Sequence, residues 1–172
     1  MYVGASNFAG WHLVKAQAAA REQRFLGLVS EQHKYSLLCR TPELEVLPAA
    51  LDLGIGVIPW SPLAGGLLGG NALKAQPGSR SAGQQERANE IRGQLEAFAA
   101  LCREMGERED VVALAWMLAN PAITAPIIGP RTIEQLQGSL RAVEVELSRD
   151  VLAKLDGIFP GPGGPAPEAY AW

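Results

Sequence analysis

Short apolar runs alternate along this chain with longer stretches in which apolar residues recur every three or four positions. The short runs predict strands buried in a sheet, and the longer ones predict amphipathic helices. We expect strands at residues 2–6, 25–30, 55–60 and 125–128. We expect helices at residues 11–24, 41–53, 85–105, 110–118, 132–142 and 148–158. Strands that alternate with helices favour an α/β fold with a parallel sheet.

Capping residues set the expected helix boundaries. Thr41 followed by Pro42 is a strong start, and Gly54 suits the left-handed residue that ends a helix. Hydroxyls at Thr132 and Ser148 and the carboxylate of Asp110 are suited to cap three later helices. Apolar side chains are expected to share one face in two helices, namely Trp11, Val14, Ala18 and Ala19 in the first and Leu44, Leu47 and Leu51 in the second. Residues 71–83 are polar and predict a surface loop.

Composition narrows the class of protein. The chain has 172 residues, 48% of them hydrophobic, and a net charge of −3, which is typical of one globular domain and gives no reason to expect nucleic acid or an anionic membrane as a partner. Cys39 and Cys102 have no metal-site spacing, so we expect free thiols and no zinc. The sequence shows neither a transmembrane run nor a targeting segment, which predicts a cytoplasmic protein.

Ligand-binding chemistry gathers where the four predicted strands end, which is where α/β folds bind ligands. The strand ends carry Ser6–Asn7, Glu31–Gln32, the glycine-rich stretch 60–66 and residues 129–132 with Arg131. Amides suit a carboxamide, an indole suits a flat ring, glycine amides suit a pyrophosphate and arginine suits a phosphate ester. Together these groups favour a dinucleotide.

Each of these features has a plainer interpretation when taken alone. Ser6–Asn7 is typical of a simple turn, Trp60 of a core residue and Arg131 of a solvated charge. The glycine run at 65–70 fits neither a P-loop nor GxGxxG, so by itself it is typical of a flexible connection. The ligand hypothesis depends on all four strand ends being polar at once.

Five blocks of sequence, in order, carry a resemblance to a known family: YVGASNF (2–8), SEQHKYSLLCR (30–40), GVIPWSPLAGGLLGG (56–70), VALAWMLANP (112–121) and IIGPRTIEQL (127–136). The chain resembles the aldo-keto reductases, most closely the bacterial branch similar to potassium-channel β subunits. The resemblance implies a (β/α)8 TIM barrel of which residues 1–159 form the second half, strands five to eight. Residues 160–172 are a proline- and glycine-rich tail.

The resemblance also implies an NADP(H) site. Ser6, Asn7 and Gln32 would hold the nicotinamide carboxamide, and Trp60 would stack on its ring. Arg131 would contact the 2′-phosphate, which favours NADP over NAD. The remaining implied contacts fall along the pyrophosphate and adenosine: Ser61, Pro62, Leu63, Ala64, Gly65, Arg80, Gly129, Gln135 and Ser139. Asn71, Gly138 and Ser139 depart from the residues usual in the family at their positions.

The family's catalytic Tyr, Lys, Asp and His belong to the first half of the barrel, so we expect no catalytic residue in this chain. Tyr35 is disfavoured as a substitute acid because its neighbour Lys34 would point to the opposite face of a strand. We expect His33 to be a loop residue. Acidic residues at Glu43, Glu45 and Asp52 are typical of the solvated face of a helix.

The family reduces aldehydes and ketones to alcohols with NADPH, and a small carbonyl compound would be the substrate of a completed barrel. Two alternatives stay open: a non-catalytic module for nucleotide binding or interaction, and a truncated inactive product. Half a barrel would expose two strand edges, 2–6 and 125–128, and an apolar interior. We therefore expect self-association or pairing with a missing N-terminal half.

Overall fold

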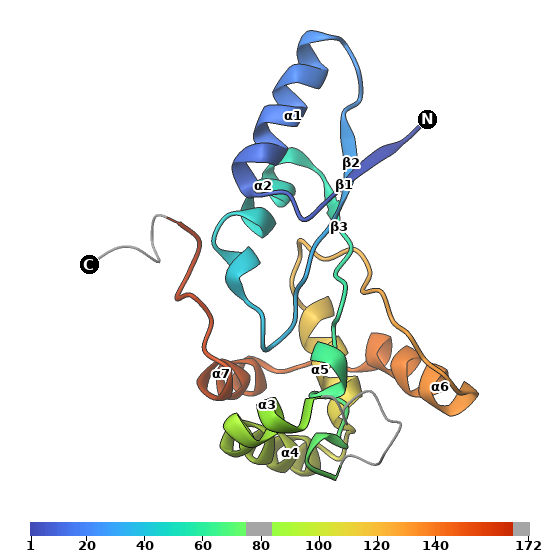
Figure 1. The fold of residues 1–172 in the computed structure, drawn as a ribbon, viewed down its shortest axis with the longest axis vertical. Helices are drawn as coiled ribbons and strands as arrows, with labels where there is room; N and C mark the ends of the chain where they lie inside the picture. Colours follow the sequence, from blue (N-terminus) through green and yellow to red (C-terminus); the bar gives the residue numbers. More distant parts are fainter. Residues whose placement is uncertain (75–83, 167–172) are drawn as a thin grey trace.

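A three-stranded parallel sheet forms one part of the molecule in the computed structural model, which describes residues 1–74 and 84–166. The strands lie in the order β1 (Val3–Ser6), β2 (Leu28–Gln32) and β3 (Gly56–Val57). Ser6 pairs with Gln32, and Ser30 pairs with Gly56. The predicted parallel α/β arrangement is therefore confirmed for three strands, as Figure 1 shows.

Seven α-helices lie in the described residues. They are α1 (Gly10–Glu22), α2 (Val46–Leu53), α3 (Gln85–Glu90), α4 (Arg92–Met105), α5 (Glu109–Leu118), α6 (Ile133–Arg141) and α7 (Arg149–Ile158). Helices α1 and α2 pack together beside the sheet, while α4 contacts both α5 and α7, and α5 contacts α6 (Figure 1). Among the described residues, no helix is both long and apolar enough to span a bilayer.

The two faces of the sheet differ in chemistry because successive side chains alternate between them. Glu31 and Val57 lie on the covered face and are fully buried. The other face carries small residues: a side chain added at Gly4 would meet Ser30, and one added at Gly56 would meet Thr124. Glycine and hydroxyl groups therefore occupy these positions, and the exposed apolar interior expected of half a barrel stays a prediction.

The predicted fourth strand, residues 125–128, is not a strand in the structure. The preceding residues do run parallel to β3, because the Thr124 amide donates to the Val57 carbonyl at 2.9 Å. Within residues 125–128, only the Ile127 backbone amide bonds to the segment that continues from β3, where it donates to the Pro59 carbonyl at 2.8 Å. Pro126 has no amide to donate, so a regular ladder cannot continue through it.

The second strand is also shorter than predicted, since it begins at Leu28 rather than at residue 25. Phe25 and Leu26 are 73% and 68% exposed, so the run of apolar letters extends beyond the buried strand. Gly27, with φ of 82°, turns the chain between these residues and the strand. The run of apolar residues therefore predicted a start for the second strand that is three residues too early.

Several helix predictions need correction. The buried residues of α1 are Gly10, Leu13 and Gln17, whereas Trp11 and Val14 are at least half exposed. In α2 the buried residues are Val46, Leu47 and Ala50, and Leu51 is exposed. Residues 41–43 form a separate 3₁₀ turn, and the helix predicted at 85–105 is interrupted at Ile91.

Helix ends followed the capping prediction more closely. The Thr132 and Ser148 hydroxyls each accept a bond from the backbone amide three residues later, at 3.3 Å. Gly54 adopts the left-handed conformation at the end of α2. Asp110 is the exception, because α5 begins one residue earlier and the Asp110 carboxylate binds a neighbouring arginine instead.

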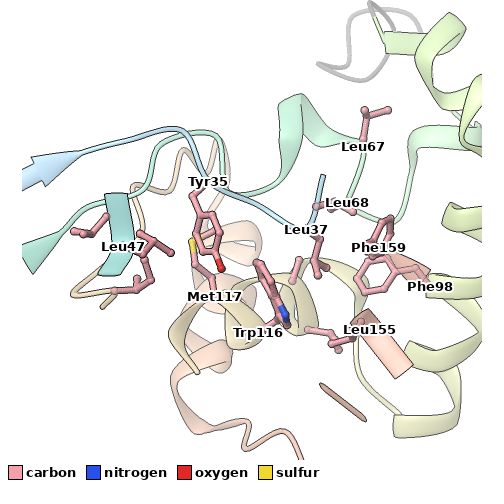
Figure 2. Close-up of a cluster of buried hydrophobic side chains, with 14 of the residues drawn as sticks. Tyr35, Leu37, Leu47, Leu67, Leu68, Phe98, Trp116, Met117, Leu155 and Phe159 are labelled. Atoms are coloured by element: carbon pink, nitrogen blue, oxygen red, sulfur yellow. The ribbon is translucent and has the colours of Figure 1, made fainter. Parts of the chain in front are cut away.

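The main hydrophobic core lies where α2, α4, α5 and α7 meet the connection that follows β2 (Figure 2). Phe98 of α4 and Phe159 after α7 meet edge to face, with ring centroids 5.5 Å apart. Tyr35 lies 5.2 Å from the ring of Trp116 on α5. Burial of these aromatic rings, each of which removes a large apolar area from water, ties the helices to the sheet.

Arg40 joins segments that are distant in the sequence. Its guanidinium donates to both carboxylate oxygens of Glu43, to Asp156 on α7 at 2.6 Å and to the Phe159 carbonyl at 2.8 Å. It also lies 5.2 Å from the centre of the Trp116 ring. Gly161 leaves the space that the guanidinium occupies, since an added Cβ would lie 2.7 Å from it.

A candidate dinucleotide site at the carboxyl edge of the sheet

Four of the predicted site residues are connected by hydrogen bonds at the carboxyl ends of the strands. The Trp60 indole donates to the Asn7 amide oxygen at 3.0 Å, and the Asn7 amide nitrogen donates to the Ser6 hydroxyl at 2.9 Å. The Ser6 hydroxyl in turn lies 3.4 Å from the Gln32 amide oxygen. We call Ser6, Asn7, Gln32 and Trp60 the amide cluster; its first three members are solvent-exposed.

Backbone geometry explains why these four residues meet. The parallel register places Ser6 beside Gln32, and the backbone N–H of Asn7 then donates to the backbone carbonyl of Gln32 at 2.9 Å. Asn7 has φ of 56°, a left-handed conformation that asparagine tolerates better than most residues. The Trp60 amide donates to the His33 carbonyl at 2.9 Å, which holds the indole at the same edge.

A buried carboxylate lies beneath the turn that carries Asn7. Glu31 is 0% exposed, and its Oε1 accepts from the Phe8 backbone amide at 2.9 Å and lies 3.1 Å from His33 Nδ1. Its Oε2 has no partner within the described part of the chain. The carboxylate therefore anchors the first residue after the left-handed turn. We expected Glu31 at a strand end, just after the strand predicted at 25–30, whereas it lies inside β2 and supports the turn.

The loop after Trp60 has an unusual backbone. Ser61, Ala64, Gly65 and Gly66 all have positive φ, and two of them are not glycine. Such left-handed residues turn successive amides toward one side, as in anion-binding nests. Several amides in this loop are already used, since Ala64 donates to Ser61 and Gly66 donates to Leu63, both at 2.9 Å. Contacts from this loop to a pyrophosphate stay a prediction.

A cleft of about 280 Å³ adjoins this loop. It contains six of the residues predicted to contact the cofactor: Pro62, Leu63, Gly129, Arg131, Gln135 and Ser139. At its edge the Arg131 backbone amide donates to the Gln135 side-chain oxygen at 2.7 Å, while the Ser139 hydroxyl donates to the Gln135 carbonyl. The Arg131 side chain is exposed at the start of α6.

The remaining predictions have mixed outcomes. Arg80 lies outside the described residues. The amide cluster and the cleft are adjacent along the sequence, because Trp60 belongs to the amide cluster and Pro62, two residues later, lines the cleft. Two residues that we did not predict for the site, Arg108 and Asp110, also line the cleft. Arg108 lies two residues before the helix predicted at 110–118, and Asp110 was interpreted as the cap of that helix.

Tyr35 is a structural residue in this fold. It is 1% exposed, and its hydroxyl donates to Glu43 at 2.8 Å and accepts from Asn120 at 3.4 Å. Burial and the neighbouring Glu43 carboxylate raise the pKa of Tyr35 well above its ordinary value. Glu43 is accordingly not the solvated residue that we expected, because it is half-buried between Tyr35 and Arg40.

A parallel sheet with amide, indole and guanidinium groups at its carboxyl edge defines an α/β protein of the kind that binds ligands there. Residues 1–159 match the Aldo/keto reductase family, so the chain belongs to that family. The fold typical of the family is an α/β TIM barrel, and the described residues form an α/β structure with three parallel strands.

Individual relatives agree with this assignment. The chain is 65% identical over 171 residues to an uncharacterized oxidoreductase, YrpG, of Bacillus subtilis, covering 99% of this chain and 52% of that protein. It is 29% identical to norsolorinic acid reductase of Emericella nidulans, over 92% of this chain and 40% of that protein. It is 30% identical to a putative voltage-gated potassium channel subunit beta of Schizosaccharomyces pombe, over 92% and 50%. The chain thus spans about half the length of the curated relatives it matches.

Proposed function

We propose that this chain forms the NADP(H)-binding half of an aldo-keto reductase that reduces aldehydes or ketones to alcohols. The observation that carries the proposal is the hydrogen-bonded amide cluster, in which Asn7 and Gln32 offer amide groups beside the Trp60 indole. A nicotinamide needs paired donors and acceptors for its carboxamide and a flat apolar surface for its ring. The residues present fit that group.

The roles of the chain's own residues follow from their positions. Ser6, Asn7 and Gln32 would fix the carboxamide, and Trp60 would cover one face of the ring and leave the other face open to the substrate. The bound cofactor supplies the hydride. Arg131 and Gln135, which line the cleft with Gly129 and Ser139, would hold the adenosine end. Ser61, Leu63, Ala64 and Gly65 would contact the pyrophosphate between them, together with Arg80.

We propose that the proton donor belongs to a segment outside this sequence. Tyr35 is unsuited to the task because it is buried, bonded to Glu43 and held in its protonated form. General acid catalysis needs a hydroxyl within hydrogen-bond reach of the substrate oxygen. The cytoplasm is the expected location, and a small carbonyl compound is the expected substrate.

Strand β1 suggests how the barrel is completed. It has one neighbour in the described sheet; Val3 on it is 54% exposed, and Tyr2 directly before it is 80% exposed. An exposed strand edge pairs readily with another strand. We propose that a preceding half of the barrel, or a second copy of this chain, pairs with this edge and with the segment that follows α5.

Binding of NADPH to the chain tests the proposal directly. We expect isothermal titration calorimetry to detect binding, and Trp60→Leu to weaken it by about tenfold, since stacking of a base on an aromatic ring contributes about 1–3 kcal/mol. Phe25→Leu is a matched aromatic control because Phe25 is 73% exposed and precedes the amino end of β2, whereas Gln32 of the amide cluster lies at the carboxyl end of that strand. Equal affinities in wild type and Trp60→Leu would show that the indole does not contact the ring.

The second candidate function is a non-catalytic nucleotide-binding module, which the resemblance to channel β subunits favours. Turnover separates the two functions. We expect the isolated chain to oxidise NADPH with 4-nitrobenzaldehyde no faster than background, and to gain activity when the missing barrel half is supplied. Robust turnover by the isolated chain would reveal a proton donor within it. Binding without turnover, even in the completed barrel, would favour the module.

A further inference from the structure

We propose that Arg108 is a second arginine in the cleft that binds the 2′-phosphate of NADP, and that it determines the preference for NADP over NAD together with Arg131. The inference rests on the proposed function, because it concerns the adenosine end of the same cofactor. Arg108 precedes α5, whereas Arg131 precedes α6, and both line the 280 Å³ cleft. The two arginines therefore line one cleft from segments that precede different helices.

Asp110 fixes the orientation of the Arg108 guanidinium. Nε donates to Asp110 Oδ1 at 2.9 Å, and Nη2 donates to Oδ2 at 2.6 Å. Two parallel bonds of this kind hold the guanidinium plane in one position. The Asp110 side chain is only 10% exposed, while that of Arg108 is 56% exposed. The arrangement thus presents a preoriented cation at a solvent-accessible surface.

Gly138 on α6 provides the space for the remaining nitrogen. A Cβ added at Gly138 would lie 3.0 Å from Arg108 Nη1 and 3.1 Å from Cζ, so a larger residue would displace the guanidinium. Within residues 1–74 and 84–166, Nη1 has no hydrogen-bond partner. It lies beside the helix that carries Gln135 and Ser139, both of which line the cleft. Nη1 is therefore the nitrogen left to bind a ligand.

Charge identifies the ligand group. Among the residues that the structure describes, the charged ones that line the cleft are Arg108, Asp110 and Arg131, which together leave one net positive charge. A 2′-phosphate carries between one and two negative charges and three acceptor oxygens, whereas NAD has a neutral hydroxyl at that position. Arginine is the side chain best matched to such a phosphate. The ion pair with Asp110 uses only Nε and Nη2 of Arg108, which leaves Nη1 for such a phosphate.

Two variants test the role of Arg108 by different routes. Gly138→Glu places a carboxylate against the guanidinium, and Arg108→Met/Asp110→Asn removes both charges without leaving a buried carboxylate unpaired. We expect each variant to weaken NADPH binding by about tenfold or more, and to change NADH binding by less than about twofold, because only NADPH carries the phosphate. Calorimetric titration with both dinucleotides measures the two affinities.

Gln137→Glu is the matched control, because it adds the same charge at the exposed neighbouring position on α6, which does not line the cleft. We expect it to leave NADPH affinity within about twofold of the wild type. The inference is overturned if Gln137→Glu weakens NADPH binding as much as Gly138→Glu does, if both dinucleotides weaken equally, or if neither variant changes the ratio. Failure of the wild-type chain to bind either dinucleotide would instead refute the proposed function itself, and this inference with it.

Discussion

Substitution of Glu31 offers the sharpest test of how the amide cluster is supported. Glu31 is fully buried on β2, and its Oε1 accepts the Phe8 amide immediately after the left-handed Asn7. The second oxygen, Oε2, has no partner in the described residues. A buried carboxylate that lacks half of its hydrogen bonds costs folding free energy, so the net contribution of Glu31 depends on the Oε1 contacts.

The magnitudes differ between two substitutions. Glu31→Gln keeps an oxygen for the Phe8 amide and removes the buried charge, so we expect the free energy of unfolding to change by less than about 1 kcal/mol. Glu31→Ala removes a hydrogen bond to a charged acceptor, worth about 1.5–3 kcal/mol, and leaves a cavity beneath the turn. Together these losses predict a destabilisation of about 3 kcal/mol, a large fraction of the stability of a small domain.

Urea unfolding followed by tryptophan fluorescence measures both values, and an unchanged slope against urea would show that the denatured state is unaffected. Leu13→Ala is a suitable reference, because it removes a fully buried apolar side chain from α1 without removing a hydrogen bond to the turn. If Glu31→Gln destabilised the protein as much as Glu31→Ala, the negative charge itself would be required, and the reasoning from the single Oε1 acceptor would be wrong.

Three further predictions concern other parts of the fold. Tyr35→Phe should cost about 1–2 kcal/mol at pH 8. The pKa of Tyr35 is raised in the folded state, so its contribution to stability is complete below a pH of about 10 and declines above that pH. Between pH 8 and pH 11 the wild type should therefore lose more free energy of unfolding than Tyr35→Phe, as measured by urea unfolding. Cys102 is buried and its pKa is raised to about 12, so Ellman's reagent at pH 8 should modify Cys39 at least about tenfold faster, and Cys39→Ser should abolish the fast phase. Thr132→Ala should cost about 1 kcal/mol in thermal unfolding by loss of the α6 cap, whereas Thr132→Ser should cost less; equal costs would show that the hydroxyl does not cap.

The ends of several helices could be predicted from the sequence because they depend on interactions between residues that are close in the sequence. The hydroxyls of Thr132 and Ser148 cap their helices, and Gly54 ends α2, because a cap depends on a few adjacent residues. Strand ends were harder to predict, since burial depends on neighbours that the sequence does not reveal. Phe25 and Leu26 have the composition of a buried strand and are nevertheless exposed.

The candidate site shows the same division. Ser6, Asn7, Gln32 and Trp60 were predictable because parallel strands bring their carboxyl ends to one edge, and the structure connects all four by hydrogen bonds. Arg108 was not predictable, since its place in the cleft depends on a glycine 30 positions later on another helix. Tertiary juxtaposition of this kind leaves no periodicity in a sequence.

The arrangement around Arg40 has a consequence for motion. The Arg40 guanidinium connects the segment between β2 and α2 to the end of α7. The same two segments are also joined by the Ala166 backbone amide, which donates to the Leu44 carbonyl at 2.8 Å. Release of the C-terminal segment would leave the Arg40 guanidinium without Asp156 and the Phe159 carbonyl, so opening of one segment is coupled to opening of the other. Hydrogen exchange should therefore report a single cooperative unit that contains both, with one common opening free energy.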